Sequence, residues 1–261
     1  MALSRAWFDR FSKVVKNLGY IQGQTDHTLF AKHFDKGKLT ILIVYVDHIN
    51  VIGDDIREMN LNKKMMAREF EVKDLGALKY FLCMEFARSK KGISLSQIKC
   101  TLDLLKETGM LGSKPNKTPI ELGNKAKMFK RDPVDNERYQ QLVSKLIYLS
   151  HTRQDIAFVV SLVSQYMHNP CQQHLNVVYK ILRYLKQTPG KGLYLKKKTS
   201  DQKVEVFTNT DWAGSIDDRK STSGYYTLLW GNLVTWQSKK AVCCCKKQCK
   251  SRVQSYGSWS V

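Results

Sequence analysis

One apolar segment near the start of the chain constrains the fold most. Residues 38–46 read KLTILIVYV, and Asp47 follows them directly. A run of this length that is rich in Ile and Val forms a strand, and a strand without polar alternation is buried. Residues 28–33 predict a partner strand across a turn at Asp35-Lys36-Gly37. We therefore expect a sheet that carries a carboxylate at the end of a buried strand.

Helices and a hairpin are predicted around this sheet. Residues 4–18 and 56–69 place apolar side chains three and four positions apart, as amphipathic helices do. Residues 80–95 predict a hairpin, and Ser96 is expected to cap the helix that follows. Prolines, glycines and lysines without periodicity make residues 115–133 the best linker.

The second half of the chain predicts helices followed by strands. Residues 138–167 and 175–187 each carry a continuous apolar stripe. Short alternating segments then predict strands of one sheet, at residues 193–195, 204–208, 225–229 and 233–236. The pattern as a whole indicates an α+β protein.

Charge and hydropathy limit the classes of partner. Lys and Arg number 43 against 23 acidic residues, and the net charge of +20 favours a polyanion such as nucleic acid. The longest apolar stretch is too short to span a membrane, and residues 1–7 lack the apolar run of a signal peptide. We expect an intracellular protein of the cytoplasm or nucleus, with its seven cysteines as free thiols and no disulfide-linked partner.

Asp47 is the first candidate for chemistry. Polymerases pair carboxylates to hold two Mg²⁺ ions about 3.5–4 Å apart. The stretch Tyr45-Val46-Asp47-His48 resembles the Tyr-Val-Asp-Asp motif of reverse transcriptases from copia-type retrotransposon Pol polyproteins. The strings RAWFDRFSKVVKNLGY, DHTLF and DLGALKYFLCMEFARSKKGISLSQIKCTLDLLKETGML resemble the same family.

The resemblance continues to the end of the helices and beyond. Residues 139–195 are similar to the family's thumb and connection, and FTNTDWAGSIDDRKSTSGYYTLLWGNLVTWQSKK resembles the opening of its RNase H domain. The family implies a partial polymerase palm with its primer-grip hairpin in residues 1–114, thumb and connection helices in 115–200, and a truncated RNase H-like α/β unit in 201–261. It also implies RNA-directed DNA polymerase and ribonuclease H activities, Mg²⁺, and a template–primer or RNA–DNA hybrid as partner.

Two substitutions depart from the family at its metal ligands. His48 replaces the second motif aspartate, and Asn209 replaces the first aspartate of the RNase H string Thr-Asp-Ala-Asp-Trp-Ala-Gly. Mg²⁺ prefers oxygen donors, and Asn lacks the charge that hydrolysis by two metals requires. Asp47 remains as a vestigial metal ligand, and Asp211 is a weaker candidate. The family's first palm aspartate lies upstream of Met1, so we predict a catalytically inactive chain.

The C-terminal residues predict a frameshift. The segment that begins at Cys243, CCCKKQCKSRVQSYGSWSV, has no hydrophobic periodicity. One back-translation, read one base later, gives VAVRSSAKAEFRAMAHGV, which resembles the family segment SSAEAEFRAMA with its catalytic glutamate. We therefore expect a one-base shift near Val242. Such a shift also explains the cysteines of this segment, which are Cys243, Cys244, Cys245 and Cys249. A zinc site explains them less well, because zinc ligands usually come in separated pairs of cysteines.

Two other interpretations stay open. The chain is alternatively a non-enzymatic nucleic-acid-binding module, with phosphate contacts from Lys196, Lys197 and Lys198. It is otherwise an unstable translation product with exposed sheet edges. The histidines show no metal-ligand spacing, and packing explains them better than catalysis; they are His27, His33, His151, His168 and His174.

Overall fold

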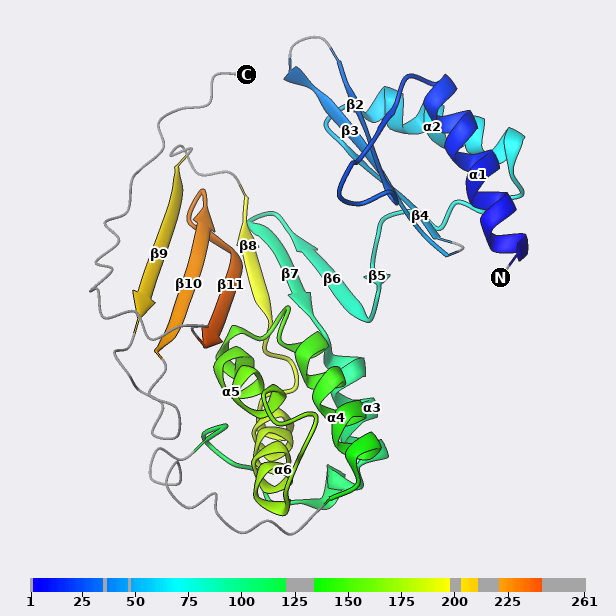
Figure 1. The fold of residues 1–261 in the computed structure, drawn as a ribbon. Coiled ribbons are helices and arrows are strands. Elements are labelled where there is room, and N and C mark those ends of the chain that lie inside the picture. The colour runs from blue at the N-terminus through cyan, green and yellow to red at the C-terminus, as the bar shows by residue number, and fades with distance from the viewer. Residues whose placement is uncertain are drawn as a thin grey trace. The chain divides into compact units, whose positions relative to one another are not determined.

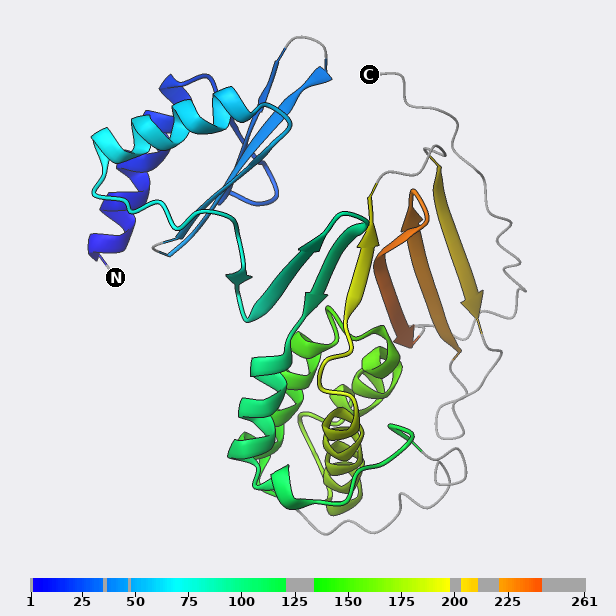
Figure 2. The same ribbon diagram turned by 180° about the vertical axis from the view of Figure 1, so that it is seen from behind.

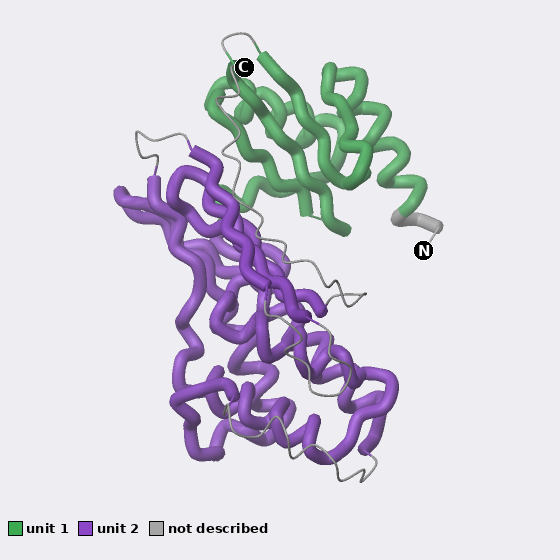
Figure 3. Tube along the Cα trace, turned by 60° about the vertical axis from the view of Figure 1, so that its left-hand side comes forward, with its two compact units in different colours: residues 1–78, 260–261 green, residues 79–259 purple. Residues whose placement is uncertain are grey.

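The computed structural model describes residues 2–34, 37–46, 48–120, 134–197, 203–210 and 221–240. Contacts divide the chain into two compact units, whose described parts lie in residues 1–78 and 79–259 (Figure 3). Both units mix helices with antiparallel strands, so the α+β class is confirmed. Each unit is described by itself.

The first unit is a four-stranded antiparallel sheet with two helices. The strands lie in chain order, as β1 (Ile21–Gln22), β2 (Leu29–His33), β3 (Leu39–Tyr45) and β4 (His48–Gly53). Helices α1 (Ala2–Asn17) and α2 (Ile56–Glu69) lie on the same side of this sheet (Figures 1 and 2). The two predicted helices and the strand at residues 39–45 are confirmed, but only alternate residues of that strand are buried, and β4 was not predicted.

The core of the first unit lies between the sheet and its helices. Phe11 of α1 and Phe30 of β2 are fully buried, and their ring centroids are 5.7 Å apart in an edge-to-face contact. Leu42 and Val44 of β3 and Met66 of α2 fill the rest of this layer. Alternate β3 residues therefore point away from the helices, and the exposed Tyr45 is one of them.

The second unit holds a helical bundle. It contains α3 (Ile98–Glu107), the 3₁₀ turn η2 (Met110–Gly112), α4 (Asn136–Leu149), α5 (Gln154–Ser164) and α6 (Gln172–Gln187). Their apolar stripes form one buried cluster. Within the described ranges, no helix is long and apolar enough to cross a membrane.

Two details of the predicted helices are wrong. Residues 138–167 form two helices, because the hydroxyl of Ser150 donates to the carbonyl of Ile147 at 2.6 Å and the chain then turns through Arg153. Such side-chain bonds compete with helical ones. Ser96 does not cap α3, whose N-cap residue is Gln97 and lacks a side-chain capping bond.

Seven strands of the second unit form two sheets, so the prediction of one sheet for the last four segments is wrong. The first sheet has the order β5 (Tyr80–Phe81), β6 (Met84–Ser89), β7 (Gly92–Ser96), β8 (Leu193–Lys196). The second has the order β11 (Asn232–Lys240), β10 (Thr222–Leu229), β9 (Val204–Thr210). Strand β8 joins the predicted hairpin because α6 packs against α3 and returns the chain beside β7.

Strand β8 contacts its neighbours through a close backbone approach to β7 and through the side-chain amide of Asn232 in β11. A Cβ atom at Gly192 would lie 2.0 Å from the carbonyl oxygen of Leu95, so only glycine fits beside β7. The side-chain amide of Asn232 accepts from the backbone N–H of Lys196 at 2.7 Å and donates to its carbonyl at 3.2 Å. These bonds link β8 to β11, and Figure 1 shows the two strands side by side.

Candidate functional site

The β3–β4 hairpin carries the polymerase-like motif. Tyr45 and His48 are the last paired residues of the two strands, which leaves only Val46 and Asp47 in the turn. Val46 is 75% exposed and has φ of 55°. A β-branched residue in this left-handed region is strained, and the favoured residues in such turns are Asn and Gly. Backbone strain of this kind gathers at functional sites.

The hairpin presents His48 away from the core. Ile49 and Val51 of β4 pack on the core, so His48 and Asn50 belong to the opposite side of the strand. Both His48 and its partner Tyr45 are exposed. Asp47 itself lies outside the described residues. The described side chains at the tip of this hairpin therefore include an imidazole and a phenol.

The carboxylate of Asp55, two residues after the end of β4, serves the following helix instead. Asp55 accepts from the backbone N–H groups of Arg57 and Glu58 as the N-cap of α2, and it pairs with Lys38 at 2.9 Å. The hydrogen bond from Lys38 and the backbone bonds hold the pKa of the Asp55 carboxyl below its usual range. Within the described residues, no three His, Cys, Asp or Glu side chains gather as a metal site.

The RNase H-like position lies on β9 in the second unit. Asn209 is exposed and pairs with Gly224 of β10. It lines a pocket of about 680 Å³ beside the aromatic row Phe207, Tyr226 and Trp236. The rings of Phe207 and Tyr226 stack at 4.7 Å. Asp211 lies outside the described residues, so the structure places only one of the two predicted RNase H residues.

The three predicted phosphate-binding lysines lie at the end of β8 and directly after it, with Lys196 as the last residue of the strand. The side chains of Lys196 and Lys197 are exposed, while Lys198 lies outside the described residues. The backbone of Lys196 is bonded by Asn232, and the N–H of Lys197 donates to the carbonyl of Lys91 at 2.9 Å. Both ammonium groups are thus carried on an ordered strand end, which is a geometry open to phosphate contact.

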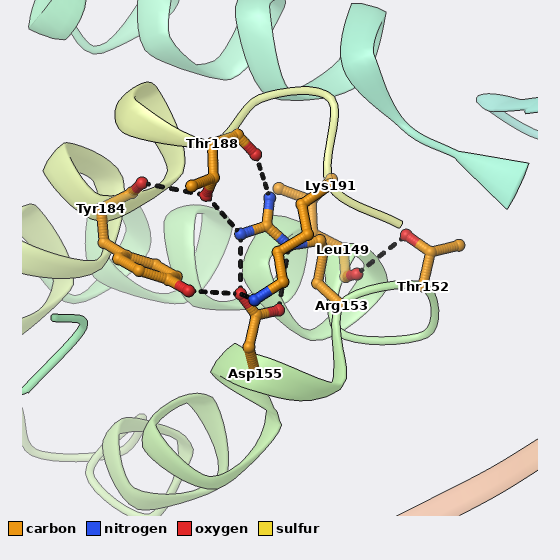
Figure 4. Close-up of polar contacts among 7 residues, drawn as sticks. All are labelled: Leu149, Thr152, Arg153, Asp155, Tyr184, Thr188 and Lys191. Atoms are coloured by element: carbon orange, nitrogen blue, oxygen red, sulfur yellow. Dashed lines mark hydrogen bonds and ion pairs between the residues drawn. The ribbon is translucent and has the colours of Figure 1, made fainter. Parts of the chain in front are cut away.

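A buried ionic cluster where the start of α5 meets the end of α6 was not predicted from the sequence (Figure 4). Arg153 is 2% exposed and binds both carboxylate oxygens of Asp155, at 3.0 and 2.9 Å. It also donates to the carbonyl and hydroxyl oxygens of Thr188, while Tyr184 and Lys191 reach Asp155. Burial alone raises the pKa of Asp155, but the bonds from Arg153 and Tyr184 outweigh it and hold that pKa well below its usual range. This cluster is a structural clasp.

A buried cysteine–histidine pair is also structural. The Nδ1 atom of His174 accepts from the backbone N–H of Cys171 at 3.1 Å and lies 3.3 Å from its sulfur. This contact caps the start of α6, and the imidazole stacks on Tyr166 with centroids 3.7 Å apart. Burial lowers the pKa of His174, which keeps the ring neutral. Packing therefore accounts for His174, as predicted from the sequence.

Comparison with known proteins shows similarity to reverse transcriptases and to transposon Pol polyproteins. The profile of a family described as reverse transcriptase (RNA-dependent DNA polymerase) matches residues 2–122. The chain is 36% identical to a retrovirus-related Pol polyprotein from transposon RE1 of Arabidopsis thaliana, over 90% of the chain and 16% of that protein. The chain thus spans about one sixth of this relative's length.

Shorter relatives match over most of their own length. An uncharacterized mitochondrial protein of Arabidopsis thaliana is 35% identical over 76% of the chain and 82% of that protein. A putative transposon Ty5-1 protein of Saccharomyces cerevisiae is 30% identical over 90% of the chain and 76% of that protein. No solved structure matches the chain.

Proposed function

Because the chain belongs to the reverse transcriptase family of copia-type retrotransposon Pol polyproteins, we propose that it is a piece of that enzyme which has lost catalysis. The first unit and the β6–β7 hairpin correspond to palm and primer grip in this proposal. The helices correspond to thumb and connection, and β9 to β11 correspond to an RNase H-like segment.

The hairpin tip carries this proposal. His48 closes the two-residue turn at the position where the family motif has its second aspartate. A neutral imidazole nitrogen is a poor ligand for Mg²⁺, and an imidazolium repels it. Two ions that activate the primer hydroxyl and the leaving group need several shared oxygens. The motif supplies Asp47 alone, so its donor set does not fit a two-magnesium polymerase centre.

The RNase H-like segment has the same deficiency. Asn209 stands on β9 where the family has a metal-binding aspartate. Its side-chain amide keeps one carbonyl oxygen but contributes no negative charge. Hydrolysis by two metal ions relies on carboxylates that offset the charge of both ions. This segment therefore lacks the charge that hydrolysis of a hybrid requires, and Asp211 is a weak candidate for a remaining metal ligand.

Activity assays test the loss of catalysis. The full chain is incubated with Mg²⁺ and either a primer–template with deoxynucleotides or a labelled RNA–DNA hybrid. We expect no primer extension and no hybrid cleavage. The matched variant Asp47→Asn distinguishes activity of this chain from activity of a contaminating polymerase, because a contaminant would be unaffected by the substitution. Extension by the wild type that Asp47→Asn abolishes would refute the proposal.

A second candidate function is nucleic-acid binding without catalysis. The observation in its favour is the net charge of +20, together with exposed lysines at the end of β8. Lysine–phosphate contacts release counterions, so affinity falls steeply with salt. The partner in this proposal is a primer–template duplex or an RNA–DNA hybrid.

Fluorescence anisotropy with a labelled primer–template measures this binding over a range of salt concentrations. The double variant Lys196→Gln, Lys197→Gln is expected to weaken binding several-fold and to flatten the salt dependence. The variant Lys13→Gln, Lys16→Gln removes the same charge from exposed positions of α1 and serves as the control. Equal loss in both variants, or affinity no higher than for heparin, would count against specific phosphate contacts.

A further inference from the structure

Two free cysteines lie where the β5–β6 hairpin contacts the start of α3. Cys83 lies in the turn, and Cys100 lies in the first turn of the helix. Both are partly exposed free cysteines. The cysteines lie 17 positions apart in the sequence, and neither has a part in the polymerase-like or RNase H-like positions.

The turn that holds Cys83 is strained. Phe81 pairs with Met84, so Leu82 and Cys83 alone connect the two strands. Their φ angles are 48° and 59°, in the left-handed region that favours Asn and Gly. The hydroxyl of Tyr148 in α4 donates to the carbonyl of Leu82 and holds the turn against the helices.

Further contacts tie the same turn to the start of α3. The backbone N–H of Lys99 donates to Glu85 Oε1 at 3.1 Å, and Glu85 pairs with Tyr80 across the strands. The ammonium of Lys99 lies 5.8 Å from the centroid of the Tyr80 ring. Cys100 follows Lys99 directly, and the thiol of Cys83 interacts with both the Tyr80 hydroxyl and the Cys100 thiol.

We propose that Cys83 and Cys100 are a redox-active pair that forms a reversible intramolecular disulfide with a peroxide as oxidant. The bond would fasten the β5–β6 turn to α3. This inference is independent of the proposed loss of catalysis, because it uses no residue of either metal-binding motif.

The chemistry balances with hydrogen peroxide. The sulfur of Cys83 gives up its proton and attacks one peroxide oxygen, the O–O bond breaks, and a sulfenic acid and a hydroxide ion form. The hydroxide takes up the proton that left the Cys83 thiol and becomes one water. The sulfur of Cys100 then attacks that of Cys83, the S–O bond breaks, and the hydroxyl leaves as a second water with the Cys100 proton. Burial raises the pKa of the Cys100 thiol to about 12, so this thiol keeps its proton until the second step and is assigned the resolving role.

Peptide mapping of the full chain tests the pair directly. The protein is treated with hydrogen peroxide, its remaining thiols are alkylated, and it is digested with trypsin. Cleavage after Lys79, Arg88, Lys99 and Lys106 places the two cysteines on the separate peptides 80–88 and 100–106. We expect these peptides to be joined, with the loss of two hydrogen masses, and to separate with dithiothreitol.

Single substitutions supply the controls. Cys83→Ser and Cys100→Ser should each abolish the joined peptides, whereas Cys171→Ser, at the N-cap of α6, should leave them unchanged. The oxidised wild type should also melt at a higher temperature than the reduced protein. The inference is overturned if the joined peptides are absent from the oxidised wild type, or if Cys83 pairs mainly with another cysteine. Both of these outcomes are measured on the wild-type protein, so the test remains valid even if a variant fails to fold.

Discussion

Replacing Arg153 by methionine removes the guanidinium from the buried clasp while keeping a long side chain in its place. Arg153 makes four hydrogen bonds, of 3.0 and 2.9 Å to Asp155 and of 2.7 and 2.8 Å to Thr188. The variant leaves the carboxylate of Asp155 at 15% side-chain exposure with Lys191 as its remaining cationic partner, at 3.2 Å.

The magnitude follows from the burial of this pair. Loss of one partner of a buried ion pair costs about 3–5 kcal/mol, because the other charge remains desolvated. Lys191 offsets part of that penalty, so we expect the Arg153→Met variant to lose about 3 kcal/mol of unfolding free energy. For a unit of this size the melting temperature should fall by roughly 6–12 °C.

Urea unfolding followed by circular dichroism measures this loss, and calorimetry measures the melting temperature. The matched control is Lys191→Met, which removes a half-exposed cation from the same carboxylate and should cost at most about 1 kcal/mol. An Arg153→Met protein within about 1 kcal/mol of the wild type would refute the assignment of the clasp as a stabilising element.

The same clasp predicts a pH dependence. The pKa of Asp155 is depressed in the folded state, so its contribution to stability is fully present above the unfolded value of about 4. That contribution is lost as pH falls from there toward the folded pKa. The difference in unfolding free energy between the wild type and Arg153→Met should therefore shrink below about pH 4. A difference that stays constant down to strongly acidic pH contradicts the ionic account.

Three other perturbations test the strand geometry and the core. Val46→Asn should stabilise the first unit by about 1 kcal/mol in urea unfolding, because Asn tolerates the left-handed conformation; no gain would argue against strain in the turn. Gly192→Ala should lower the unfolding free energy of the second unit by about 1–3 kcal/mol in urea unfolding, since the alanine Cβ would lie 2.0 Å from the carbonyl oxygen of Leu95. An unchanged unfolding free energy would contradict the close approach of β7 and β8. Burial raises the pKa of Tyr20 to about 12 despite its bond from Asn62, and the pKa values of Tyr80 and Tyr139 are raised as well. Ultraviolet titration should therefore show several tyrosines ionising late, Tyr20 among them, and stability should fall between about pH 10 and pH 12. Ionisation of every tyrosine near pH 10 would refute it.

Local patterns specified most elements of this protein. The apolar run that became β3, the amphipathic stripes of α1, α2 and α6, and the hairpin of β6 and β7 are all readable within about 15 consecutive residues. The resemblance to copia-type reverse transcriptases is also a property of the amino-acid string, and the comparisons confirm it. The identity of His48 and Asn209 needs no structure, and their effect on catalysis stays a prediction.

Tertiary structure decided which elements meet. Strand β8 lies beside β7, although nearly a hundred residues separate them, because the packing of α6 on α3 brings the chain back to that edge. At the break between α4 and α5, Arg153 donates to the carbonyl of Thr188, 35 positions later, a partner that no local pattern names. The bonds from Tyr148 to Leu82 and from Lys99 to Glu85 hold the β5–β6 hairpin on the helices, and no local pattern predicts them. Side-chain periodicity reports what a segment buries, whereas the choice of partner depends on the free energy of the whole packed unit.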